Sequence, residues 1–169
     1  MNVAPFLDLP LYIQLHAASA SLAILIGPIA IYRKRRDRLH KTTGYVWVFA
    51  MVTVALTGLF IPSFGLSVIW HLGPIHLFVA LTLITLWHGM RAIFRGDIVA
   101  HRAAFSGLYW HGLLIAGLFN FLPGRMTNRS LFPDNPEIGY VVLAVGCASI
   151  VWIRLIKPRL KGAKHLNRA

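Results

Sequence analysis

Histidine is the residue type in this sequence most able to carry chemistry, because a neutral imidazole binds metal ions and moves protons near neutral pH. The chain has eight histidines, and five of them fall between residues 71 and 111. Their surroundings are largely apolar, and polar groups kept in such surroundings usually face a partner, a cofactor or a pathway. The four that we expect to lie deep in apolar segments are His16, His76, His88 and His111.

The composition places these histidines in a membrane protein. The sequence is 57% hydrophobic and 13% charged, against roughly 45–50% and 25% in soluble domains. Apolar runs recur that reach about 20 residues, the length needed to cross a hydrocarbon core. We therefore expect an all-α polytopic bundle of five transmembrane helices, forming a single transmembrane domain over residues 1–169. The predicted spans are residues 11–32, 44–61, 74–94, 103–122 and 138–156, followed by a basic tail at 157–169.

The basic residues predict the orientation of the bundle. Fifteen of the 17 Lys and Arg residues fall in the first loop, the third loop and the C-terminal tail, and only Arg125 and Arg129 fall on the other side. The positive-inside rule then puts the N-terminus outside and the C-terminus in the cytoplasm. The net charge of +12 indicates contact with anionic lipid headgroups on the cytoplasmic side. No nucleic-acid motif accompanies it, so nucleic acid is not an expected partner.

Helical rise assigns depths to the histidines. At about 1.5 Å per residue, His16 and His76 share an outer level, and His88 and His111 share an inner level. Histidines that face each other at one depth could be the axial ligands of a b-type haem in the dry interior of a bundle. The sequence thus predicts a redox protein with haem b, or a quinone, bound through these four histidines. His76 and His111 are the candidates for binding the haem iron. The inner-surface cations that could pair with haem propionates are Lys41, Arg91, Arg95 and Arg102.

Other observations limit the chemistry and leave alternatives open. All five acidic residues lie outside the spans, Cys147 is the only cysteine, and no HExxH motif is present. A di-iron carboxylate site, an iron–sulfur cluster and a zinc protease are therefore not expected. No catalytic residue is indicated. The deep histidines could also be structural, satisfied by backbone carbonyls. The alternative function is a non-catalytic accessory subunit of a larger membrane complex, or a homo-oligomer, favoured by the small size and the histidine-free fifth span.

Two short motifs carry a family resemblance. Residues 40–45 read HKTTGY and residues 95–102 read RGDIVAHR. They resemble the signatures of a bacterial family of predicted multi-span membrane proteins with a domain of unknown function. The similarity covers about residues 11–122, but the sequence differs from the family pattern at residues 103–105. It implies a bacterial cytoplasmic (inner) membrane and, besides His16, an inner-surface motif of His40, Gly44, Asp97, His101 and Arg102.

The inner-surface motif also has a structural interpretation. Gly44 would let the second span pass close to a neighbour. Asp97 would cap the loop or pair with Arg95 or Arg102, and His40 and His101 would bond to carbonyls that end the first and third spans. Such a motif would hold the inner ends of the helices together, or bind a lipid phosphate or a quinone headgroup.

Overall fold

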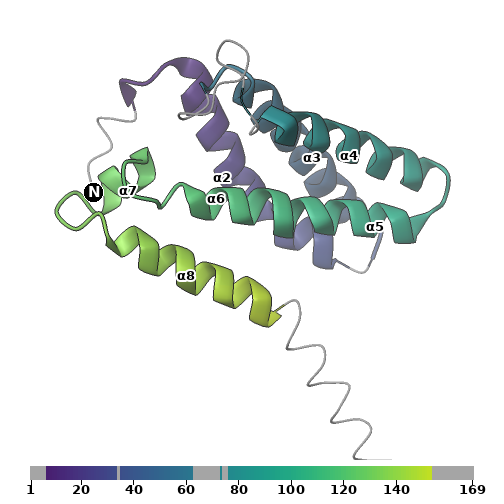
Figure 1. Ribbon diagram of the computed structural model, residues 1–169. Coiled ribbons are helices and arrows are strands. Elements are labelled where there is room, and N and C mark those ends of the chain that lie inside the picture. Colours follow the sequence, from purple (N-terminus) through teal and green to yellow (C-terminus); the bar gives the residue numbers. More distant parts are fainter. Residues whose placement is uncertain (1–6, 34, 63–72, 74–75, 154–169) are drawn as a thin grey trace, which may run out of the picture. The chain divides into compact units, whose positions relative to one another are not determined.

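The computed structural model describes residues 7–33, 35–62, 73 and 76–153, and all regular structure within these ranges is helical (Figure 1). The all-α prediction is therefore confirmed. The elements are α2 (Leu11–Tyr32), α3 (Arg38–Gly58), α4 (Leu77–Phe94), α5 (Ile98–Gly107), the π-helix η2 (Leu108–Leu114), α6 (Ile115–Phe119), α7 (Met126–Leu131) and α8 (Ile138–Val151).

Two of these helices, α2 and α4, are long and apolar enough to cross a membrane, judged by length and composition. They coincide with the first and third predicted spans. The range predicted for the fourth span is divided among α5, η2 and α6, and α8 has 14 residues. Five spans and their orientation stay predictions.

The chain divides into two compact units, Ala4–Leu114 and Ile115–Ala169 with Met1–Val3. The first unit consists of two helical hairpins, in which α2 packs mainly on α3 and α4 mainly on α5. Its centre is occupied by aromatic side chains. Trp47 of α3 is 1% exposed, its ring centroid lies 5.5 Å from that of Phe105, and its indole N–H donates to the Ala23 carbonyl at 3.0 Å.

The two hairpin turns use the same capping chemistry. Asp37 accepts a hydrogen bond from the His40 amide at 3.0 Å and begins α3, and Asp97 accepts one from the Ala100 amide at 2.9 Å and begins α5. A side-chain acceptor at this position satisfies an amide that the helix itself leaves free. Before Asp97, Gly96 has φ +80° and closes α4 with bonds from the Gly96 and Asp97 amides back to residues 93 and 92. This is the glycine-dependent C-terminal motif of helices.

Proline 28 shows how the two hairpins are tied together. The sequence predicts that Pro28 kinks or ends the first helix early, but α2 continues to Tyr32. Proline has no N–H, so the carbonyl four residues earlier, that of Ile24, loses its helical donor. The Tyr109 hydroxyl donates to this carbonyl at 3.2 Å. A side-chain donor from a neighbouring helix is how helices tolerate proline where water is absent.

Gly27 makes this contact possible, since a β-carbon there would overlap the Tyr109 ring. We predict that Gly27→Ala lowers the free energy of unfolding by about 1–3 kcal/mol, the usual cost of overpacking. Unfolding in mixed detergent micelles measures it. The matched control is Gly44→Ala, where no described atom lies within 4 Å of the added carbon; it should be neutral or stabilise by up to about 1 kcal/mol. Equal effects of the two changes would contradict this account of the packing.

The second unit is organised around Asn128, which is fully buried. Its amide nitrogen donates at 2.8 Å to the carbonyls of both Phe121 and Pro136. Gly139, the second residue of α8, lies so close that a β-carbon would overlap the Phe121 carbonyl oxygen and the Asn128 amide. Further along α8, Gly146 receives the side chain of Leu118 from α6. The side-chain amide of Asn128 thus joins the two ends of the segment between α6 and α8 through hydrogen bonds.

Candidate functional site

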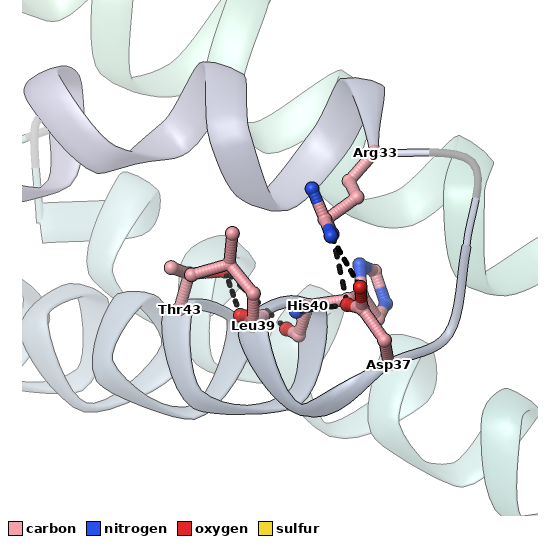
Figure 2. A network of polar contacts seen from close by, with 5 residues as sticks. All are labelled: Arg33, Asp37, Leu39, His40 and Thr43. Carbon is pink, nitrogen blue, oxygen red and sulfur yellow. Dashed lines mark hydrogen bonds and ion pairs between the residues drawn. The ribbon is translucent and has the colours of Figure 1, made fainter.

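The end of the first unit that holds the turns at residues 33–37 and 95–97 carries the inner-surface motif, and we call it the basic end. Arg33, just after α2, forms an ion pair with Asp37; its Nε donates to Oδ1 at 2.8 Å, and a second N–H donates to Oδ2 (Figure 2). The Arg33 guanidinium and the His40 amide hold the pKa of Asp37 well below its usual range. Asp37 thereby links the end of α2 to the first turn of α3, which carries His40.

His40 lies half-buried in that turn, ahead of the predicted second span. Burial lowers its pKa first, and the charges of His101 and Arg102 lower it further, while the Ala30 carbonyl and Asp37 act in the opposite direction. His101 and Arg102 belong to α5, so these influences put the two halves of the motif within electrostatic range of each other. Nδ1 of His40 is buried and has no hydrogen-bond partner in the described part of the chain.

His101 is held by a backbone carbonyl from the neighbouring helix. Its Nδ1 lies 3.0 Å from the Gly89 carbonyl oxygen of α4. Because a carbonyl only accepts, Nδ1 must donate, and in the neutral ring Nε2 then keeps its lone pair. The ring also packs on Phe105, with centroids 4.7 Å apart. The predicted bond between His101 and a carbonyl of the third span is therefore confirmed, although Gly89 lies five residues before the end of α4.

The structure corrects the expectation for Gly44 and decides between the two roles expected for Asp97. No described atom comes within 4 Å of a β-carbon built on Gly44, so the expected close approach at this glycine is wrong. The reason is that α3 already begins at Arg38 and Gly44 lies on its open side. Asp97 acts as the helix cap; the ion pair found among the described residues is Arg33–Asp37 and does not involve Asp97.

At the opposite end, the structure brings His16 close to the beginning of α4. Nδ1 of His16 lies 3.0 Å from the Val54 carbonyl and 3.2 Å from the Thr57 hydroxyl of α3. Both His16 and Val79 of α4 lie against Gly58, and His76 precedes Val79 by one turn. Nδ1 of His76 lies 3.0 Å from the Gly73 amide nitrogen and 3.3 Å from the Gly73 carbonyl oxygen.

The predicted inner pair is not brought together. His88 and His111 are both exposed and line two different clefts along α4 and α5. Gly89 and Ala104 meet across this hairpin, and His111 lies seven residues beyond Ala104, or about 10 Å along the helix. The structure thus places the two rings in separate clefts, and their pairing on one iron stays a prediction.

The pairing of His40 with His101 was not expected from the sequence, which placed both at the membrane boundary. A usable signal was nevertheless present. Each histidine follows a helix-capping aspartate, by three residues after Asp37 and by four after Asp97, and each precedes a basic residue. The described residues contain no cluster of three or more His, Cys, Asp or Glu side chains able to hold a metal ion.

We predict that the protein loses stability as the pH falls from about 8 to about 5. The pKa of His40 in the folded protein is below its usual value of about 6.5. The neutral ring is therefore favoured by folding, and this contribution is present above pH 6.5 and lost as the pH falls through the folded pKa. Thermal unfolding in detergent measures it, and His40→Gln should flatten the dependence. Asp37 titrates below this window. An identical pH profile in the variant would contradict the prediction.

The apolar composition, the helical fold and the two helices of membrane length are those of a membrane protein. Its sequence matches the family described as predicted membrane protein (DUF2306) over residues 13–153, and the chain belongs to this family. The match contains both motifs and confirms the resemblance drawn from them. Neither the curated proteins nor the solved structures contain a match to the chain.

Proposed function

We propose that this membrane protein binds a b-type haem at its basic end through His40 and His101, and that it carries electrons. The observation that carries the proposal is that His40 of α3 and His101 of α5 lie within electrostatic range of each other, and that each ring has a nitrogen without a hydrogen bond among the described residues. In His101 the Gly89 carbonyl takes Nδ1 and leaves the Nε2 lone pair. In His40 the buried Nδ1 has no partner among the described residues.

Three features of the two rings support the proposal. A lowered pKa keeps His40 neutral at pH 7, and the neutral imidazole is the form that binds a metal. A backbone carbonyl on the far nitrogen of a ligating histidine fixes its tautomer and orientation, as for His101 here. The aromatic side chains of Phe105 and Trp47 lie next in the core and exclude water. A bound haem would supply one-electron chemistry between ferric and ferrous iron.

The opposite end of the unit supports a second site less well. His16 presents the same tautomer as His101, because the Val54 carbonyl takes its Nδ1. His76, however, has its Nδ1 3.0 Å from the amide nitrogen and 3.3 Å from the carbonyl oxygen of Gly73, so no contact with a neighbouring helix orients this nitrogen toward a ligand. The proposal is therefore confined to the basic end.

We place the protein in the bacterial cytoplasmic membrane as a multi-pass chain with the basic end facing the cytoplasm. The support is the distribution of Lys and Arg described above, together with the family's description as a predicted membrane protein. In this orientation an electron carried at the basic end would be exchanged near the inner surface.

The experiment is a haem assay on protein produced with an ample haem supply and purified in mild detergent. We expect about one haem per chain, the content that a single pair of axial histidines supports. A folded, colourless protein would overturn the proposal. The accessory-subunit alternative would then be tested by identifying the proteins that co-purify.

A further inference from the structure

A groove runs along the α4–α5 hairpin of the first unit. It consists of two clefts that meet at Ala104. The first, of about 480 Å³, is lined at its polar end by Trp87, His88, Arg91, Arg95, Asp97 and Ala100. The second, of about 300 Å³, is lined chiefly by apolar and small residues, among them Phe78, Leu81, Ala103, Gly107 and Leu108. We call the whole the α4–α5 groove.

The polar end holds two guanidinium groups without a carboxylate partner. The ion pair that the described residues form is Arg33–Asp37, which leaves Arg91 and Arg95 outside any salt bridge there. Asp97 lines the same cleft, but its Oδ1 accepts from the Ala100 amide as the cap of α5. Arg91 lies over the Trp87 ring, 5.1 Å from its centroid, which orients its charge. This end is built to receive an anion through charge-assisted hydrogen bonds.

The apolar end has the shape and length for a hydrocarbon chain. Gly107 leaves open space, since no described atom lies within 4 Å of a β-carbon built there. The groove extends along thirteen residues of α4, from Arg91 to Phe78, which is a length of about 20 Å. This is somewhat more than half the thickness of a hydrocarbon core of about 30 Å. A ligand that filled the groove would need one anionic end and one long apolar end.

We propose that the α4–α5 groove binds an anionic phospholipid, with the phosphate between Arg91 and Arg95 and one acyl chain along the apolar end. The inference is independent of the haem proposal, because it uses neither His40 nor His101. It goes beyond the general attraction of basic loops to anionic membranes, because it assigns one lipid to one built site.

Native mass spectrometry of the protein in neutral detergent tests the proposal, with phosphatidylglycerol, phosphatidylcholine and inorganic phosphate as the probes. We expect phosphatidylglycerol to bind at least about tenfold more tightly than phosphatidylcholine, because both carry the phosphate but the choline cation of phosphatidylcholine cancels its charge and is repelled by the two guanidinium groups. The double variant Arg91→Gln/Arg95→Gln should lose this preference. The matched control is Arg36→Gln, which removes a cation from an exposed loop residue of the same unit and should keep the preference.

A second variant tests the apolar end without changing charge. Gly107→Leu puts a side chain into open space inside the groove, so we expect a folded protein that binds phosphatidylglycerol about tenfold more weakly. Haem content serves as an independent readout and should stay unchanged in Gly107→Leu and in the Arg36→Gln control. Equal binding of both lipids, or displacement of phosphatidylglycerol by inorganic phosphate at the same concentration, would overturn the proposal. So would an equal loss in the Arg36→Gln control.

Discussion

The His101→Ala protein is expected to retain less than about a tenth of the haem bound by the unmodified protein, because a bis-histidine site loses an axial ligand. His40→Ala should behave in the same way. His88→Ala and His111→Ala are the matched controls; they remove exposed imidazoles from α4 and η2 and should leave the haem content unchanged. The haem assay, normalised to folded protein, measures all four variants.

This series separates two pairings of the histidines. Depth counting along the sequence pairs His88 with His111, whereas the structure brings His40 into electrostatic range of His101. Loss of haem in His88→Ala or His111→Ala, with retention in His101→Ala, would contradict the pairing at the basic end. To exclude simple unfolding, His101→Gln keeps a polar group that can donate to the Gly89 carbonyl while removing the ligand nitrogen. It should be folded and free of haem.

Trp47→Ala is expected to lower the free energy of unfolding by about 3–5 kcal/mol. The indole is 1% exposed, packs on Phe105 and donates to the Ala23 carbonyl. Its removal leaves a cavity where α2, α3 and α5 meet and takes away that hydrogen bond. Reversible unfolding in mixed micelles gives the value.

The control for Trp47→Ala lies two residues along the same helix. Phe49 is 73% exposed, so Phe49→Ala removes an aromatic ring of α3 that contributes little to the interior, and we expect a change within about 0.5 kcal/mol. If the two variants lost equal stability, the position of the core described here would be wrong. Trp47→Phe should fall between them, because it keeps a ring but loses the donor to Ala23.

The sequence predicts much of this fold because its signals are local. Apolar length locates α2 and α4. The predicted starts of the second and fourth spans, residues 44 and 103, miss the first turns of α3 and α5, which begin after the caps Asp37 and Asp97. The interior could not be predicted in the same way. Tertiary packing decides which helix faces become neighbours. It therefore decides that Tyr109 supplies the hydrogen bond missing at Pro28, and that Trp47 rather than Trp87 is buried.

In the candidate site, too, some features follow from the local sequence and others from tertiary packing. A histidine's depth along a helix follows from counting residues, but its direction around the helix and its partner depend on tertiary packing. His16 lies beside α3 and the beginning of α4, near the level expected for it. His88 of α4 and His111 of η2 are exposed, whereas the boundary residues His40 and His101 lie within electrostatic range of each other. Repeated Asp-capped turns, each with a histidine one turn later, were the sequence feature that could have indicated this.

The binding of haem iron by His40 and His101 is tested most directly by the electron paramagnetic resonance spectrum of the oxidised protein purified in mild detergent. We expect a low-spin ferric signal typical of two imidazole ligands, lost in both His40→Ala and His101→Ala. A high-spin signal, or a low-spin signal that survives in both variants, would contradict the assignment of His40 and His101 as a pair of axial ligands.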